Sequence, residues 1–195
     1  MFWIFKSATA FNQNLGSWNV VNVTTMSSMF DSSGLTRTNY DPILLGWSAQ
    51  NVKTGVTFHA GSAKYSQSAA VLAARSTLTT AVASGGKGWT ITDGGGEAVA
   101  PSAPTSVSGT AGNAEVSLSW AAPSDTGGSA ITDYIVQYKL SSDSTWSTFS
   151  DGTSTNTTAT VTSLTNGSSY DFQVAAKNTA GTSTFTQTSS SITPT

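Results

Sequence analysis

Few side chains of this chain could do catalytic or metal chemistry, and the first to consider is His59, the single histidine, in the stretch VTFHAG. A general acid or a metal site built on one histidine needs a second group beside it, and the sequence has no cysteine to supply one. We therefore interpret His59 as a strand or cap residue that is satisfied by a hydrogen bond. The ten acidic residues are scattered without a paired-carboxylate motif, although distant ones could meet in space. The sequence predicts no catalytic residue, no metal ligand and no cofactor, and hence a protein that is not an enzyme.

Glycine-rich and acidic loops also fail to match a known ligand pattern. The stretch SGGKGW departs from a phosphate-binding loop, because Lys87 is followed by Gly88 and the first required glycine is missing. The stretches DGTSTN and DTGGSAITD contain oxygen ligands but lack the ordered acidic spacing of a calcium loop. We interpret both as turns, with weak surface binding of calcium left open.

Composition bears on the classes of partner. Only 9% of the residues are charged, the net charge is -2, and no basic run could neutralise a row of phosphates. Nucleic acid is therefore not an expected partner. No apolar run approaches the roughly 20 residues that cross a bilayer, so no membrane span is expected in this chain. About a third of the residues are serine or threonine, a composition that suits extracellular bacterial or virion surfaces.

The elements that position these side chains begin with a repeat. Sliding the sequence against itself by 25 residues places Met1 on Met26 and Phe5 on Phe30, and such a period is typical of solenoids, whose units stack to bury a shared core. Within residues 11–30, alternation around Trp18 predicts a short strand. The spacing of the apolar residues that follow predicts one or two helical turns. The predicted core residues of this unit are Leu15, Trp18, Val20, Val23, Met26, Met29 and Phe30.

The stretch FNQNLGSWNVVNVTTMSSMF, residues 11–30, resembles the unit of the BspA-type bacterial surface leucine-rich repeat. The resemblance implies a short α/β solenoid end over residues 1–96, in which residues 34–96 form the cap. In that cap Ser66 or Ser68 is expected to begin a helix that ends before Gly85, and the stretch WTIT is expected to form a closing strand. The residues predicted to face inward from this helix are Ala70, Leu72, Ala73 and Leu78.

Residues 97–104, rich in small residues and proline, are predicted to be a linker, and residues 105–195 an all-β sandwich of the immunoglobulin-like class. Alternating runs such as AEVSLSW and ITDYIVQYKL carry the pattern. They resemble a fibronectin type III domain, with Trp120, Tyr134 and Val136 at family core positions. The resemblance implies that Tyr170 buries its ring and bonds through its hydroxyl to the backbone near Leu164.

These resemblances favour a non-catalytic extracellular, cell-surface protein that serves adhesion or protein recognition, with the fibronectin-like domain as spacer or second binding module. The expected partner is a surface protein or glycan of a host or neighbouring cell. One alternative is a structural component of a phage virion, such as a tail fibre or decoration protein. Another is an accessory part of a secreted glycan-degrading enzyme.

Two surfaces are candidate binding sites. Outward polar positions of the repeat, Ser17, Asn19 and Thr24, would line up in a stack and make many weak contacts. The start of the chain falls in the middle of a repeat, so its apolar side chains are expected to contact upstream repeats, a second copy or another partner. These are Met1, Trp3, Ile4 and Phe5.

Overall fold

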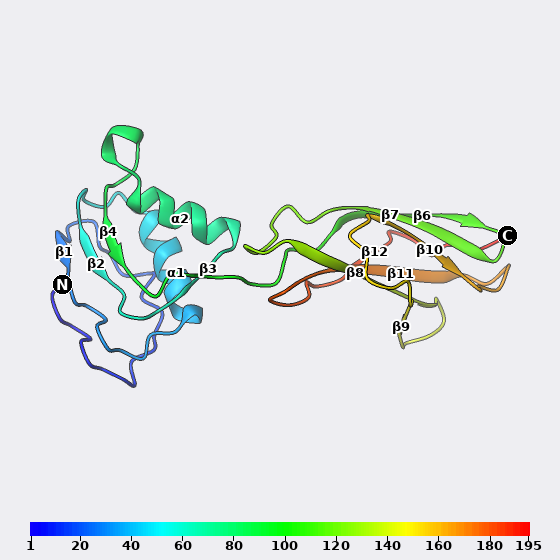
Figure 1. The fold of residues 1–195 in the computed structure, drawn as a ribbon, viewed down its shortest axis with the longest axis horizontal. Helices are drawn as coiled ribbons and strands as arrows, with labels where there is room; N and C mark the ends of the chain where they lie inside the picture. Colours follow the sequence, from blue (N-terminus) through cyan, green and yellow to red (C-terminus); the bar gives the residue numbers. More distant parts are fainter. The chain divides into compact units, whose positions relative to one another are not determined.

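Two separate hydrophobic cores organise the chain. The computed structural model describes all 195 residues, which divide into a first unit of residues 1–98 and a second unit of residues 99–195 (Figure 1). The boundary falls inside the segment 97–104 that the sequence marks as a linker. Glu97 pairs with Ser66 in the first unit, whereas the amide of Val99 donates to the carbonyl of Gly127 in the second. Both ends of the predicted linker are therefore held by a unit.

The first unit combines two helices with short parallel strands. Three strands form one parallel sheet in the order β1-β2-β4, and β3 pairs with β5 in a second, two-stranded ladder. The helices α1 and α2 lie on one side of the β1-β2-β4 sheet (Figure 1). The bounds are β1 Thr25–Met26, α1 Arg37–Ser48, β2 Thr57–His59, β3 Tyr65–Ser66, α2 Ala69–Thr79, the 3-10 helix η1 Val82–Ser84, β4 Thr90–Thr92 and β5 Gly96–Glu97.

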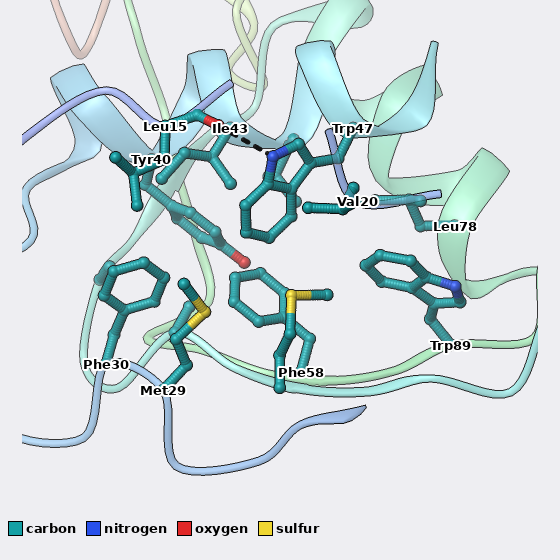
Figure 2. Packing of buried hydrophobic residues seen from close by; sticks show 14 of the residues in the cluster. Leu15, Val20, Met29, Phe30, Tyr40, Ile43, Trp47, Phe58, Leu78 and Trp89 are labelled. Atoms are coloured by element: carbon teal, nitrogen blue, oxygen red, sulfur yellow. Dashed lines mark hydrogen bonds between the residues drawn. The ribbon is translucent and has the colours of Figure 1, made fainter. Parts of the chain in front are cut away.

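The core of the first unit fills the space between this sheet and the helices. Figure 2 shows Tyr40 and Trp47 of α1 directed toward Phe58 of β2, and all three side chains are fully buried. The indole nitrogen of Trp47 donates to the carbonyl of Leu15 at 2.9 Å, so the buried polar atom of the largest core side chain is satisfied. This bond also ties α1 to the chain segment that precedes β1.

Helix α1 and that preceding segment approach so closely that two glycines are required. A Cβ atom on Gly46 of α1 would overlap the carbonyl oxygen of Gly16 and lie 2.9 Å from its Cα atom. A Cβ atom on Gly16 would in turn overlap the carbonyl oxygen of Pro42. Backbone therefore packs directly on backbone here, a contact that only residues without a side chain allow.

The predicted 25-residue offset is confirmed as a backbone pairing of the first residues with the segment around β1. The terminal amine of Met1 donates to Thr25 at 2.9 Å, and the amide of Phe5 donates to Met29 at 3.0 Å. Each acceptor lies 24 residues after its donor, which agrees with the predicted offset, although residues 1–5 form no strand. After β1 the spacing lengthens, because α1 is inserted before β2 and α2 before β4. This insertion explains why the sequence pattern fails after Phe30.

The helical turns predicted within residues 22–30 are wrong. This segment consists of turns and the short strand β1. The amide of Val23 donates to Val20, that of Met29 to Met26, and that of Ser33 to Phe30, each closing a turn across three residues. Turns of this span place apolar side chains three apart, as a helix would, and the same spacing therefore led to the wrong element.

The strand predicted around Trp18 is also wrong, and so is the burial of its side chain. No strand includes Trp18, and the residue is 36% exposed, whereas Leu15 and Val20 on either side are buried. Val23 is only partly buried and packs at the margin of the core. Alternation over so few residues reflected turns in which every second or third side chain happens to face the core.

The inward face predicted for α2 is wrong at three of its four residues. Ala70, Leu72 and Ala73 are exposed, whereas Leu78 is buried as predicted, together with Val71 and Ala74. The run AAVLAARSTL is apolar around much of the helix, so its period does not distinguish between neighbouring faces. The helix begins after Ser68, but the Ser68 hydroxyl bonds to the Ser66 hydroxyl at 3.0 Å and makes no cap. The closing strand predicted from WTIT is present as β4.

The second unit is a sandwich of two antiparallel sheets. One sheet has the order β10-β7-β6 and the other β12-β11-β8-β9 (Figure 1). The bounds are β6 Thr105–Gly112, β7 Glu115–Ala121, β8 Ile131–Leu140, β9 Ser147–Thr148, β10 Thr158–Thr162, β11 Tyr170–Asn178 and β12 Thr186–Gln187. Side chains that alternate inward along β7 and β8 form its core, as the period of two predicted.

The predicted core positions of the sandwich are confirmed. Trp120, Tyr134 and Val136 are buried, and so is Tyr170 at the start of β11. The hydroxyl of Tyr170 accepts a hydrogen bond from the amide of Thr165 at 3.1 Å. This residue follows Leu164, so the expected bond back to the nearby backbone is present. It fixes the corner between β10 and β11.

Candidate functional site

The outer face of the β1-β2-β4 sheet carries hydroxyl side chains in register. Thr25 pairs with Thr57, and Thr57 pairs with Thr90, so three threonines form one row across the sheet. Neighbouring strands in such a sheet lie about 4.8 Å apart, which sets the spacing of the hydroxyls. Since successive side chains point to opposite faces, the buried partners of this row are Met26 and Phe58. We call Thr25, Thr57 and Thr90 the threonine row.

Sequence reasoning missed this row because it placed the strand around Trp18, well before β1 at Thr25–Met26. The predicted binding residues Ser17, Asn19 and Thr24 are all exposed. Only Thr24 adjoins the threonine row, since it directly precedes β1. The other two lie in a turn, where the side-chain oxygen of Asn19 accepts from the amide of Val21 at 3.2 Å. The row could have been found from the T-x-[TSH] triplets centred on Met26, Phe58 and Ile91.

The turn around Asn19 is held from α1's end. The side-chain nitrogen of Gln50 donates to the carbonyl of Trp18 at 2.8 Å, and its side-chain oxygen accepts from the amide of Val20 at 3.0 Å. One amide side chain thus satisfies the backbone on both sides of Asn19. The turn is a fixed feature of the surface.

The apolar start of the chain divides into an exposed and a packed part. Phe2, Trp3 and Ile4 are 54%, 55% and 49% exposed, and the Phe2 and Trp3 rings stack with centroids 4.6 Å apart. In contrast, Met1 and Phe5, which were predicted to share this edge, are partly buried against the core of the first unit. The Phe5 ring stacks on Phe11 and Phe30, with centroids 3.8 and 5.5 Å away. The exposed apolar edge is therefore Phe2, Trp3 and Ile4.

His59 ends strand β2 and is paired, as the sequence predicted. Its Nδ1 atom lies 3.0 Å from an Asp31 carboxylate oxygen, and both side chains are about one third exposed. The hydrogen bonds from His59 and then from Ser28 hold the pKa of Asp31 below its usual value. A shallow hollow of roughly 400 Å³ beside the pair is lined by Lys6 and Ser62 among others.

This pair has one feature of a catalytic dyad, an imidazole held by a carboxylate. The bonds of both side chains are local and tie β2 to the turn after β1, which is a structural role. In the whole structure no group of three or more His, Cys, Asp or Glu side chains is placed to hold a metal ion. No helix has the length and apolar character that a membrane-spanning helix needs.

Comparison with known proteins divides the chain in the same way. Residues 100–192 match the family model of the fibronectin type III domain. Residues 1–72 match a family described as "Mycoplasma protein of unknown function, DUF285". The first match covers most of the second unit and gives independent support to its sandwich. The second gives no specific support to a leucine-rich repeat.

Among solved structures, a crystal structure of domains from titin is 29% identical, with 55% of this chain and 35% of that chain covered and a TM-score of 0.46. A structure of titin kinase and its flanking domains is 33% identical, covering 49% of this chain and 18% of that chain, with a TM-score of 0.45. The twitchin kinase region from C. elegans is 28% identical, covering 49% and 17%, with a TM-score of 0.44. The chain thus spans about a third or less of each of these proteins. The family match and the sandwich together support a fibronectin type III domain, a non-catalytic type of module, in the second half of the chain.

Proposed function

We propose that this chain is part of a non-catalytic extracellular surface protein for adhesion or protein recognition. The observation that carries the proposal is the fibronectin type III match over residues 100–192, because domains of this kind are protein-interaction modules. In this proposal the first unit is the end of a BspA-type repeat array. Its support is the parallel backbone pairing of the first residues with the segment around β1.

The recognition surface of the first unit is the polar face around the threonine row. Thr25, Thr57 and Thr90 lie in register across the sheet, and the exposed Thr24 directly precedes Thr25 in the chain. Hydroxyl groups donate and accept hydrogen bonds without the desolvation cost of charges, which suits many weak contacts to a protein surface. Ser17 and Asn19 are a second candidate surface, on the turn held by Gln50.

The experiment compares capture of the whole chain by immobilised fibrinogen, laminin and collagen, with albumin as blank. Variant Thr57→Val with Thr90→Val removes two hydroxyls of the row while keeping side-chain shape. Variant Ser17→Ala with Asn19→Ala tests the turn. Loss of capture by about tenfold, roughly 1.4 kcal/mol, is expected for the first pair. The melting temperature of the first unit should stay nearly unchanged, because none of these four side chains belongs to its buried core.

A matched control is Ser142→Ala, an exposed hydroxyl in the second unit. Its capture should equal that of the unmodified chain. Capture by a matrix protein that both double variants leave unchanged would contradict the proposed face. Capture by none of the three proteins would contradict an adhesive role toward the extracellular matrix.

A further inference from the structure

The strand β10 is an edge of the sandwich, and half of its backbone faces away from its own sheet. The amide of Trp120 in β7 donates to the carbonyl of Thr157 at 3.0 Å. Hydrogen-bonded residues alternate along an antiparallel ladder, so β10 bonds to β7 through every second residue from Thr157 onward. The N–H and C=O groups of the residues between them point away from β7. These residues are Thr158, Thr160 and Thr162.

Nothing else in the second unit occupies this open side. No backbone hydrogen bond outside the ladder reaches the three threonines, and all three residues are exposed. Two open hollows adjoin Thr158, Ala159 and Thr160, one toward the loop before β10 and the other on the face of β6 and β7. A further strand can therefore approach β10 from the side.

The other edges of the sandwich are protected against such an approach. β9 and β12 have only two residues each. The pairing of β6 is irregular between Thr105 and Ser108, and Ser106 between them has a positive φ of 54°. Native edge strands are also protected by charges or proline, and the sequence TATVT of β10 has neither. A regular, uncharged edge that is left open is typical of a strand that pairs with another chain.

The sequence of β10 is also symmetric in a way that suits a second copy of itself. Threonines at both ends and at the centre alternate with the apolar Ala159 and Val161. In an antiparallel pair centred on Thr160, this residue lies opposite Thr160 of the second copy, and Thr158 lies opposite Thr162. Each of these pairs brings free N–H and C=O groups together and can exchange both backbone hydrogen bonds. Threonine lies opposite threonine, and no like charges meet.

We propose that β10 pairs antiparallel with β10 of a second copy of this chain, with the two-fold axis at Thr160. The β10-β7-β6 sheets of the two copies then form one continuous sheet. The contact is separate from the threonine row and does not depend on the function proposed for the first unit. A dimer of this kind carries two first units, so that two weak contacts to a surface act together.

The first test measures self-association of the whole chain by sedimentation equilibrium. Five residues a side make a small interface, so we expect a dimer with a dissociation constant of about 0.1–1 mM. Thr160→Lys and Thr160→Glu each place like charges opposite each other at the axis and should weaken the dimer by about fivefold or more. An equimolar mixture of the two variants should restore it. The matched control is Thr110→Lys, exposed on β6 two strands away, which should change nothing.

The second test fixes the register by cross-linking. The chain has no cysteine, so one introduced thiol reports alone. Residues of a hydrogen-bonded pair have Cα atoms about 5.5 Å apart, a distance that a disulfide spans. Thr160→Cys should therefore form disulfide dimers under mild oxidation. Thr158→Cys alone should form few, because two copies of Thr158 are four residues apart along the strands, or about 13 Å. Mixed with Thr162→Cys it should cross-link.

Three results would overturn the proposal. The first is a chain that stays monomeric at about 1 mM, which would leave β10 to an extended segment of a different protein. The second is a dimer whose affinity Thr160→Lys does not change, which would place the contact elsewhere. The third is equal disulfide yield from Thr158→Cys and Thr160→Cys, which would exclude the symmetric register.

Discussion

Replacing Gly46 by alanine sets two physical effects against each other. Gly46 lies inside helix α1, where alanine is intrinsically more favourable than glycine by about 1 kcal/mol. However, the added Cβ atom would lie 2.9 Å from the Cα atom of Gly16, where unstrained carbon atoms keep about 3.5–4.0 Å. The helix and the segment before β1 must therefore separate by about 0.6 Å or more. The separation also stretches the bond from Trp47 to Leu15.

Overpacking of this kind costs about 1–3 kcal/mol. Because backbone atoms oppose the new methyl group, we place the overpacking cost at the upper end of this range. After the gain in helix propensity is subtracted, Gly46→Ala should lower the free energy of unfolding by about 1–2 kcal/mol. Both α-helices belong to the first unit, so far-UV circular dichroism in the helical band follows mainly that unit within the whole chain. In urea the midpoint should fall by about 0.5–1 M for a slope of about 2 kcal/mol/M.

A matched control is Thr38→Ala, at an exposed position of the same helix. This change should leave the urea midpoint the same or raise it slightly, because only helix propensity is altered. A higher midpoint for Gly46→Ala than for the unmodified chain would refute the reasoning. It would mean that propensity outweighs the contact, and that the loop does not rest on α1 as described.

Three other predictions test the structure. Tyr170→Phe should speed hydrogen exchange of the Thr165 amide about fivefold, from the loss of a bond worth about 1 kcal/mol, and unchanged exchange would contradict the corner bond. In urea titrations Leu78→Ala should lower the unfolding free energy of the first unit by about 2–5 kcal/mol, and Leu72→Ala by under about 0.5 kcal/mol. Equal losses would mean that Leu72 also packs against the core, as the sequence predicted. Hydrogen bonds from its lysine partner and then a serine lower the pKa of Asp171, so its stabilisation is present above about pH 4 and is lost as pH falls through the lowered value. Asp171→Asn should therefore lower the melting temperature of the second unit at pH 7 but not at about pH 2, and an equal loss at both would exclude the charge as the cause.

The sandwich could be predicted in detail because its strands are long enough to alternate. Seven residues of β7 and ten of β8 give a clear period of two, and the corner Tyr170 has a specific neighbourhood in the sequence. In the first unit the strands have two or three residues, and so short a strand shows no alternation of apolar and polar residues in the sequence. There, turns closed across three residues imitated a helix. Helix α1, which contains Pro42, was not predicted from the sequence pattern.

The candidate sites were less predictable than the fold, because each is made by pairing across the chain. The threonine row exists only once Thr25, Thr57 and Thr90 are in register, and nothing in their separate neighbourhoods predicts that register.

The two core clusters share no residue, and no disulfide joins any part of the chain. Each core therefore stabilises its own half of the chain. Heating or denaturant should open the halves in separate cooperative steps, and a single melting temperature would not describe the chain. A half that has opened stays attached to one that has not. It can refold while the other half stays native, so a substitution that unfolds one half need not abolish the function of the other.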